Sequence, residues 1–139
     1  MWMVYALLGA LFAAATAVLA KIGMEGVNAS LATAVRTVVV LAMTWGIVFA
    51  LGLQQGLETL TRRNWLFLIL SGVATGLSWL FNFAALKGGD VSKVAPIDKS
   101  SLALTMALAF LFLGEKITLP ALVGGGLVTA GMLVLVFWK

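Results

Sequence analysis

Residues 82–101 read NFAALKGGDVSKVAPIDKSS and separate two long apolar segments. The first segment ends within this stretch, a short charged turn follows, and the second segment begins with Pro96, Asp98 and Lys99. A charged group at the centre of a membrane helix costs about 2.5–3.5 kcal/mol on insertion scales, so such a residue usually has a partner or a function. The stretch therefore predicts two membrane helices joined by a turn, with charges in the second helix that need an explanation.

The composition of the whole chain predicts a membrane protein. Of its 139 residues, 63% are hydrophobic and 10% are charged, whereas soluble domains are about 25% charged. The start lacks a basic leader region, so we expect the first apolar segment to be retained as a helix. A bilayer core takes about 20 helical residues. We predict one all-α integral membrane domain over residues 1–139, with helices at about 2–20, 31–52, 65–86, 94–113 and 119–138.

The same composition disfavours several functional classes. The chain has no cysteine and no histidine, so the usual metal ligands and the usual general base are missing. No recognised catalytic motif is present, and we expect neither a catalytic residue, a metal nor a cofactor. The basic residues occur singly or in pairs, whereas a nucleic-acid-binding surface needs a clustered basic face. We expect the lipid bilayer, and not nucleic acid, to be a partner.

A polar stripe runs along the third predicted helix. Ser71, Thr75, Ser78 and Asn82 are spaced by four, three and four residues, so they share one face, and Trp79 lies beside them. Two interpretations remain open. The hydroxyl groups can bond to their own backbone, or the stripe can line a polar cavity inside a helix bundle.

Small residues mark surfaces where another helix backbone can approach closely. We expect helix packing or dimer contacts at six glycines of the third and fifth predicted helices, namely Gly72, Gly76, Gly124, Gly125, Gly126 and Gly131.

The Lys and Arg residues near the helix ends give only a weak bias for the orientation of the chain in the membrane. With five spans, one membrane face would hold Arg62, Arg63 and Lys116. The other face would hold Lys21, Lys87, Lys93 and Lys139. Because the Lys and Arg bias sets orientation, two explanations remain open: one weakly specified orientation, or insertion in both orientations followed by antiparallel pairing.

Three stretches resemble a known family. They are AKIGMEGVNASLATAVRT at residues 20–37, WLFNFAALKGGDVSKVAPIDKSS at residues 79–101, and FLGEKIT followed by GGGLVTAG within residues 112–131. Together they resemble the EamA domain of the drug/metabolite transporter superfamily, in particular its small five-helix bacterial and archaeal members. Most relatives carry two such domains in opposite orientations, an inverted repeat of ten helices. The resemblance implies that this chain forms half of that architecture and completes it as an antiparallel homodimer with dual topology.

The charges of an antiparallel dimer, together with polarity and helical phase, suggest roles for particular residues. Arg36 lies about one turn inside the second predicted helix. We expect Asp98 to pair with Arg36 or Lys21 and to gate a cavity, with Lys99 beside it; the alternative is a static ion pair that fixes helix register. We expect a substrate cavity lined by Tyr5, Thr16, Trp45, Ser78, Trp79 and Asn82.

The predicted function is transport of a small metabolite across the cytoplasmic (inner) membrane by a multi-pass secondary carrier or exporter. The middle of the first helix has no acidic residue, in contrast to the glutamate of the four-helix multidrug relatives, which disfavours a quaternary-ammonium exporter. A flippase or lipid-linked carrier subunit and a non-transporting membrane scaffold are the alternatives.

Overall fold

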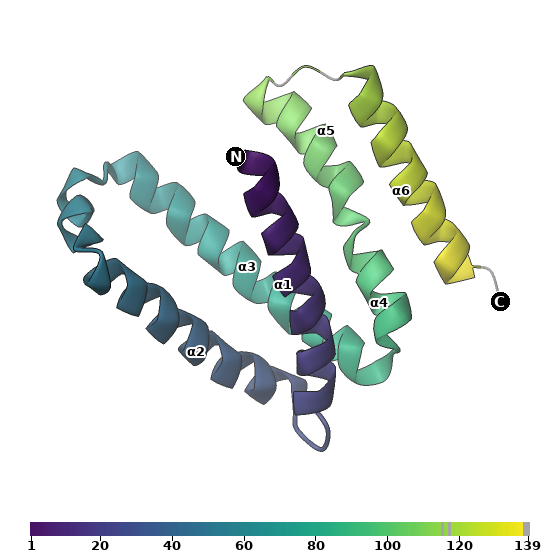
Figure 1. Cartoon of the computed structure of the whole chain (residues 1–139), viewed down its shortest axis with the longest axis horizontal. Coiled ribbons are helices and arrows are strands. Elements are labelled where there is room, and N and C mark those ends of the chain that lie inside the picture. Colours follow the sequence, from purple (N-terminus) through teal and green to yellow (C-terminus); the bar gives the residue numbers. More distant parts are fainter. Residues whose placement is uncertain (115, 117, 138–139) are drawn as a thin grey trace. The chain divides into compact units, whose positions relative to one another are not determined.

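The computed structural model describes residues 1–114, 116 and 118–137, and its elements are all helical (Figure 1). Within the described residues, five helical spans are long and apolar enough to cross a membrane. This confirms the all-α class and five helical segments of membrane-spanning length. The elements in chain order are α1 (Trp2–Gly23), α2 (Ala29–Ala50), the 3₁₀-helix η1 (Leu53–Thr59), α3 (Arg62–Gly88), α4 (Val91–Asp98), α5 (Ser101–Leu113) and α6 (Leu119–Phe137).

Side chains of the turns set where several helices begin. Asn28 caps α2 by accepting a hydrogen bond from the backbone N–H of Ser30 at 2.9 Å. Thr61 accepts a 3.2 Å hydrogen bond from the backbone N–H of Asn64, so α3 begins at Arg62, three residues before the predicted start. Trp138, where we predicted the last helix to end, lies outside the described residues.

The segment predicted as one helix over residues 94–113 is divided into α4 and α5. Asp90 occupies the N-cap position of α4, so Pro96 is the sixth helical residue and not part of the first turn. Proline removes a backbone donor and crowds the preceding turn. Beyond it, the backbone N–H of Ser100 donates to Ile97 and that of Leu102 donates to Lys99, which are the tighter three-residue bonds of a 3₁₀ turn.

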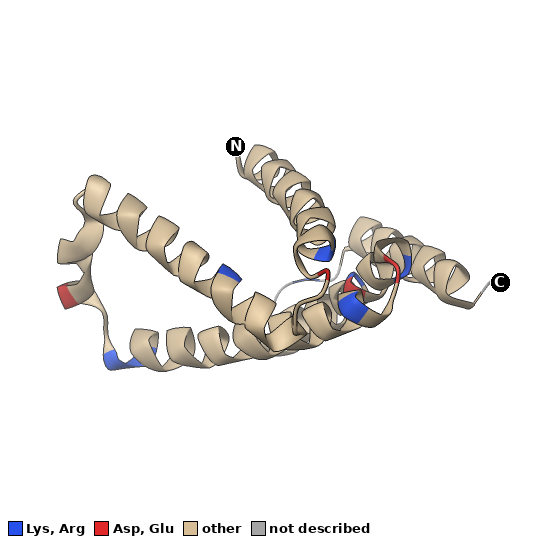
Figure 2. Ribbon diagram, turned by 90° about the horizontal axis from the view of Figure 1, so that it is seen from below, with Lys and Arg blue, Asp and Glu red and all other residues tan. Residues whose placement is uncertain are grey.

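The chain divides into two compact units, of which residues 18–88 form one. In this unit α2 contacts α3, and η1 joins them (Figure 1). Both views show α2 and α3 close together where α2 begins and α3 ends, and apart at η1 (Figures 1 and 2). The side chains buried in this unit are Met24, Thr33, Phe83 and Leu86.

The other unit contains residues 1–17 and 89–139. Within its described part, α4 and α5 both contact α6, and Val94 of α4 is buried.

Most large apolar side chains of both units are exposed. Exposed apolar surface of this extent marks a membrane or partner-covered protein. Together with the five apolar spans, it fits a multi-pass membrane protein whose helices face lipid.

Candidate functional site

Arg36 is a cation inside a membrane-spanning helix. It lies seven residues beyond Ala29, the first residue of α2, which corresponds to about 10 Å along the axis. The guanidinium carbon, Cζ, lies 4.5 Å from the ring centroid of Trp79 and 5.2 Å from that of Phe83, both on α3. Arg36 is thus half-buried against two aromatic rings.

The packing of α2 on α3 explains this position. Trp79 and Phe83 are four residues apart on α3 and therefore share a face. Phe83 is buried, as is Thr33, which lies three residues before Arg36 on α2. The hydroxyl of Thr33 donates to the carbonyl of Ala29 at 2.9 Å, so it is satisfied by its own helix. The Arg36 side chain is therefore held at the closely packed end of the α2–α3 pair, against the face of α3 that carries Trp79 and Phe83.

The two rings offset only part of the cost of this cation. A cation–π contact contributes about 0.5–2 kcal/mol, depending on its exposure, and an arginine at the centre of a membrane helix costs about 2.5–3.5 kcal/mol. The rings also supply no acceptor for the five guanidinium N–H groups. Within residues 18–88, all of which are described, Arg36 has no ion pair or hydrogen bond.

Lys21 reaches the same end of α3. Its Nζ donates to the backbone carbonyl of Leu86 at 2.6 Å. That carbonyl belongs to the last turn of α3, where a cation also complements the helix dipole. Lys21 and Arg36, from α1 and α2, therefore both contact the C-terminal turns of α3.

The other predicted cavity residues of this unit lie outside the aromatic contact. Asn82 is half-buried and Ser78 is exposed. Trp45 lies on α2, with its ring centroid 5.5 Å from that of Phe49. In the polar stripe, the hydroxyl of Thr75 bonds to the carbonyl of Ser71 at 2.9 Å, as the backbone-bonding interpretation predicts for that residue.

Tyr5 and Thr16 belong to the other unit, where Tyr5 is exposed and Thr16 is half-buried on α1. Their place in a substrate cavity stays a prediction.

Asp98 and Lys99 lie at the break between α4 and α5, also in the second unit. The Asp98 carboxylate lies 3.6 Å from the ammonium of its neighbour Lys99, and both side chains are exposed. The hydroxyl of Ser101 donates to the Asp98 carbonyl at 2.8 Å. Their predicted gating role, and the pairing of Asp98 with Arg36 or Lys21, stay predictions.

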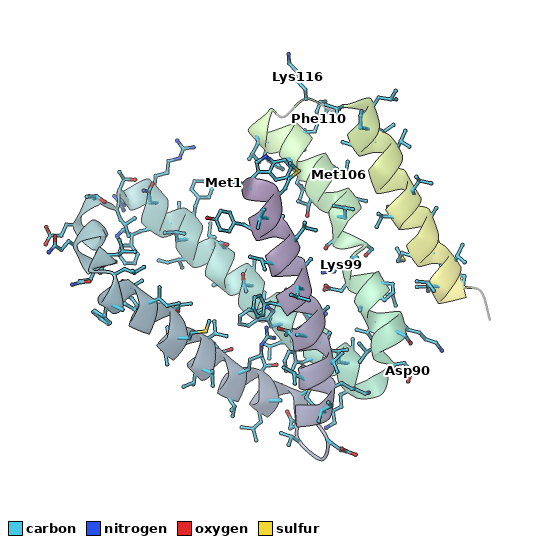
Figure 3. The ribbon with its side chains drawn as sticks, in the orientation of Figure 1. Met1, Asp90, Lys99, Met106, Phe110 and Lys116 are labelled. Carbon is cyan, nitrogen blue, oxygen red and sulfur yellow. The ribbon has the colours of Figure 1, made fainter. Side chains whose placement is uncertain are left out.

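A groove of about 650 Å³ runs between α5 and α6. Its walls are mostly apolar and include Met106, Phe110 and Leu122, with Thr105 and Thr129 among the polar residues. Lys116, in the connection between the two helices, adds one charged side chain to the lining. Figure 3 labels Met106 and Phe110 on α5 and Lys116 in the connection beyond it.

Of the six glycines predicted to pack, Gly125 approaches another helix closely within its unit. A Cβ atom built on Gly125 would lie 2.8 Å from Sδ of Met106, whereas nothing lies within 4 Å of a Cβ built on the other five. A packing role for Gly72, Gly76, Gly124, Gly126 and Gly131 stays a prediction.

Phe83 and the Leu86 carbonyl are site components that the sequence analysis did not identify. The signal for Phe83 was its spacing of four residues from Trp79. The carbonyl has no signal in the sequence, because every residue carries one.

These observations define an all-helical, multi-pass membrane protein that holds an arginine on aromatic side chains inside one span. The chain matches the EamA-like transporter family over residues 1–137 and belongs to that family. It is 48% identical over 134 residues to an uncharacterized transporter in the cobO 3' region of Sinorhizobium sp., a match that covers 96% of this chain and 95% of the relative.

A second relative is an uncharacterized protein of Methanocaldococcus jannaschii, 36% identical over 69 residues and covering 50% of each chain. No solved structure matches this chain. The family and the Sinorhizobium relative indicate transport and not catalysis.

Proposed function

We propose that this protein is a secondary carrier of a small metabolite that works by alternating access as an antiparallel homodimer in the cytoplasmic membrane. The family supports membrane transport. The main support for the proposal is the position of Arg36, inside a span and in contact with two aromatic rings. A charged residue at such a position marks a substrate or ion pathway.

The odd number of spans supports the dimer. A chain with five spans has its termini on opposite membrane faces, so a second copy in the reverse orientation reproduces an inverted repeat. The homodimer then carries two equivalent sites, one near each face. Alternating access opens one while the other is closed.

The exposed Asp98–Lys99 pair is the proposed gate. The pair lies at the break between α4 and α5, where the tighter backbone bonds interrupt the regular helix. An Asp98 that exchanges Lys99 for Arg36 or Lys21 would close one side of the predicted substrate cavity. A static pair would instead fix the register of these helices.

Liposomes containing the purified protein test this function. We expect saturable flux for at least one member of a panel of amino acids, organic acids and sugar phosphates, and a flux at least about tenfold lower in a folded Asp98→Asn variant. Protein-free liposomes and a Lys93→Gln variant are the controls, because Lys93 is exposed and lies outside the proposed gate. Unchanged flux in Asp98→Asn would contradict a gating role for Asp98. No flux of any compound by a membrane-inserted dimer would support the scaffold alternative.

The α5–α6 groove favours a second candidate, a flippase or lipid-linked carrier subunit. An apolar groove with Lys116 in its lining fits an acyl chain with an anionic headgroup. This candidate predicts movement of a labelled anionic phospholipid between leaflets and no metabolite flux. The carrier predicts metabolite flux and no movement of the labelled phospholipid between leaflets.

A further inference from the structure

Arg36 presents charged N–H groups that its own unit leaves without an acceptor. We propose that these groups bind an oxyanion, a carboxylate or phosphate carried by the transported metabolite. The inference rests on the proposed function and names the chemical class of its substrate.

The aromatic contacts position the guanidinium without neutralising it. Cζ lies over the rings of Trp79 and Phe83 at 4.5 and 5.2 Å. Rings attract a cation through their faces but accept no conventional hydrogen bond, so the planar fork of N–H groups remains available. Such a fork matches the two oxygens of a carboxylate or phosphate.

The charge of the unit favours an anion. Residues 18–88 contain five basic side chains and two acidic ones, Glu25 and Glu58, which gives a net charge of 5 − 2 = +3. Both acidic residues are exposed, Glu25 in the turn before α2 and Glu58 in η1, so neither lies in a membrane span. Within this unit, a positively charged site with no carboxylate in its membrane spans attracts anions and repels cations.

A second cation lies near the same turns of α3. Lys21 donates to the carbonyl of Leu86, three residues beyond Phe83, the residue under Arg36. Two cations beside neighbouring turns of α3 suit a ligand with more than one anionic oxygen.

The oxyanion could belong to a soluble metabolite or to a lipid headgroup. The depth of Arg36, about 10 Å along α2 from Ala29, favours a solute that enters the membrane domain. Headgroups lie outside the hydrocarbon core.

The test measures binding without flux. We expect phosphate and succinate, titrated into the purified protein at fixed ionic strength, to raise its thermal unfolding midpoint saturably. Arg36→Lys keeps the charge but loses the fork and should weaken binding by at least about tenfold. Trp79→Leu, which removes one ring, is a second variant and should also weaken binding.

Arg63→Lys is the matched control. Arg63 also lies over an aromatic ring, that of Phe67, at 5.8 Å, but it is exposed at the start of α3. The substitution should leave anion binding unchanged. Equal weakening by Arg63→Lys and Arg36→Lys would overturn the assignment, because it would show a general loss of basic character.

Phosphate binding in lipid vesicles distinguishes a soluble anion from a lipid headgroup as the source of the oxyanion. Phosphate binding that persists when phosphatidylglycerol is added to phosphatidylcholine vesicles supports a soluble anion. Competition by phosphatidylglycerol supports the oxyanion site but assigns it to a headgroup, which overturns the metabolite as its ligand.

Two further results would overturn the site itself. The first is no saturable binding of either anion. The second is binding that appears only in Asp98→Asn, which would show that Asp98 already neutralises Arg36. Metabolite flux without anion binding would contradict an anionic substrate but would agree with the carrier function. Anion binding without any flux would agree with the oxyanion site but would contradict the carrier function.

Discussion

Gly125 on α6 packs against the thioether of Met106 on α5. A Cβ atom at this position would lie 2.8 Å from Sδ and 3.2 Å from Cε of Met106. Both atoms belong to the flexible end of the side chain, so a small addition can be accommodated, whereas a branched one must displace Met106. The pair therefore fixes how closely α5 and α6 approach.

We predict that Gly125→Val lowers the stability of the α5–α6 pair by about 1–3 kcal/mol, the usual cost of overpacking. The readout is the thermal unfolding midpoint in detergent. Gly126→Val is the matched control, because nothing lies within 4 Å of a Cβ at Gly126. Adding Met106→Ala to Gly125→Val should restore most of the loss. A double variant no more stable than Gly125→Val would contradict this contact.

At the residue scale, Arg36 and Trp79 were both predicted from the sequence as site residues, but the contact between them was not predicted. Arg36 stands out in the sequence as a charge within an apolar segment, and Trp79 stands out because it lies beside a polar stripe. Which face of α3 meets α2 depends on the packing of the two helices, and that packing also brings Phe83 under the guanidinium. Sequence periodicity describes faces within one helix, not the pairing of faces between two helices.

At the scale of elements, the five membrane spans were predictable because bilayer thickness sets the length of an apolar segment. The break in the fourth span was not predicted. A helix predicted to begin at about residue 94 has Pro96 in its first turn, where proline is tolerated. With Asp90 as the N-cap, Pro96 lies inside the helix and the tighter turn follows at Ser100.

We predict that Pro96→Ala joins α4 and α5 more regularly and slows backbone hydrogen exchange at residues 99–101 by severalfold or more. The restored N–H can bond to the carbonyl of Ser92, and an interior proline costs about 3 kcal/mol relative to alanine. Exchange is read by mass spectrometry in lipid nanodiscs.

The control is Pro120→Ala. Pro120 is the second residue of α6 and lies in the first turn, where no intrahelical donor is lost. Its substitution should not change exchange at residues 99–101. If Pro96→Ala leaves exchange there unchanged as well, the break has a cause other than the proline.

At the scale of the whole molecule, the described chain buries few side chains and exposes most of its large apolar ones. Lipid covers such surfaces readily, but the charged and polar groups of α2 and α4 need a bundle interior or a partner. The proposed antiparallel second copy would supply that partner without a second gene product. The nearly equal numbers of basic residues expected on the two membrane faces are consistent with insertion in both orientations.

The orientation of the C-terminus in native membranes tests the antiparallel carrier most directly. Paired reporters, each active on one membrane face, are fused after Lys139 in otherwise identical chains. We predict comparable signal from both reporters, and we predict that an extra arginine pair in the α2–α3 connection shifts the signal to one face. Signal from one face alone in the unmodified chain would contradict the antiparallel homodimer.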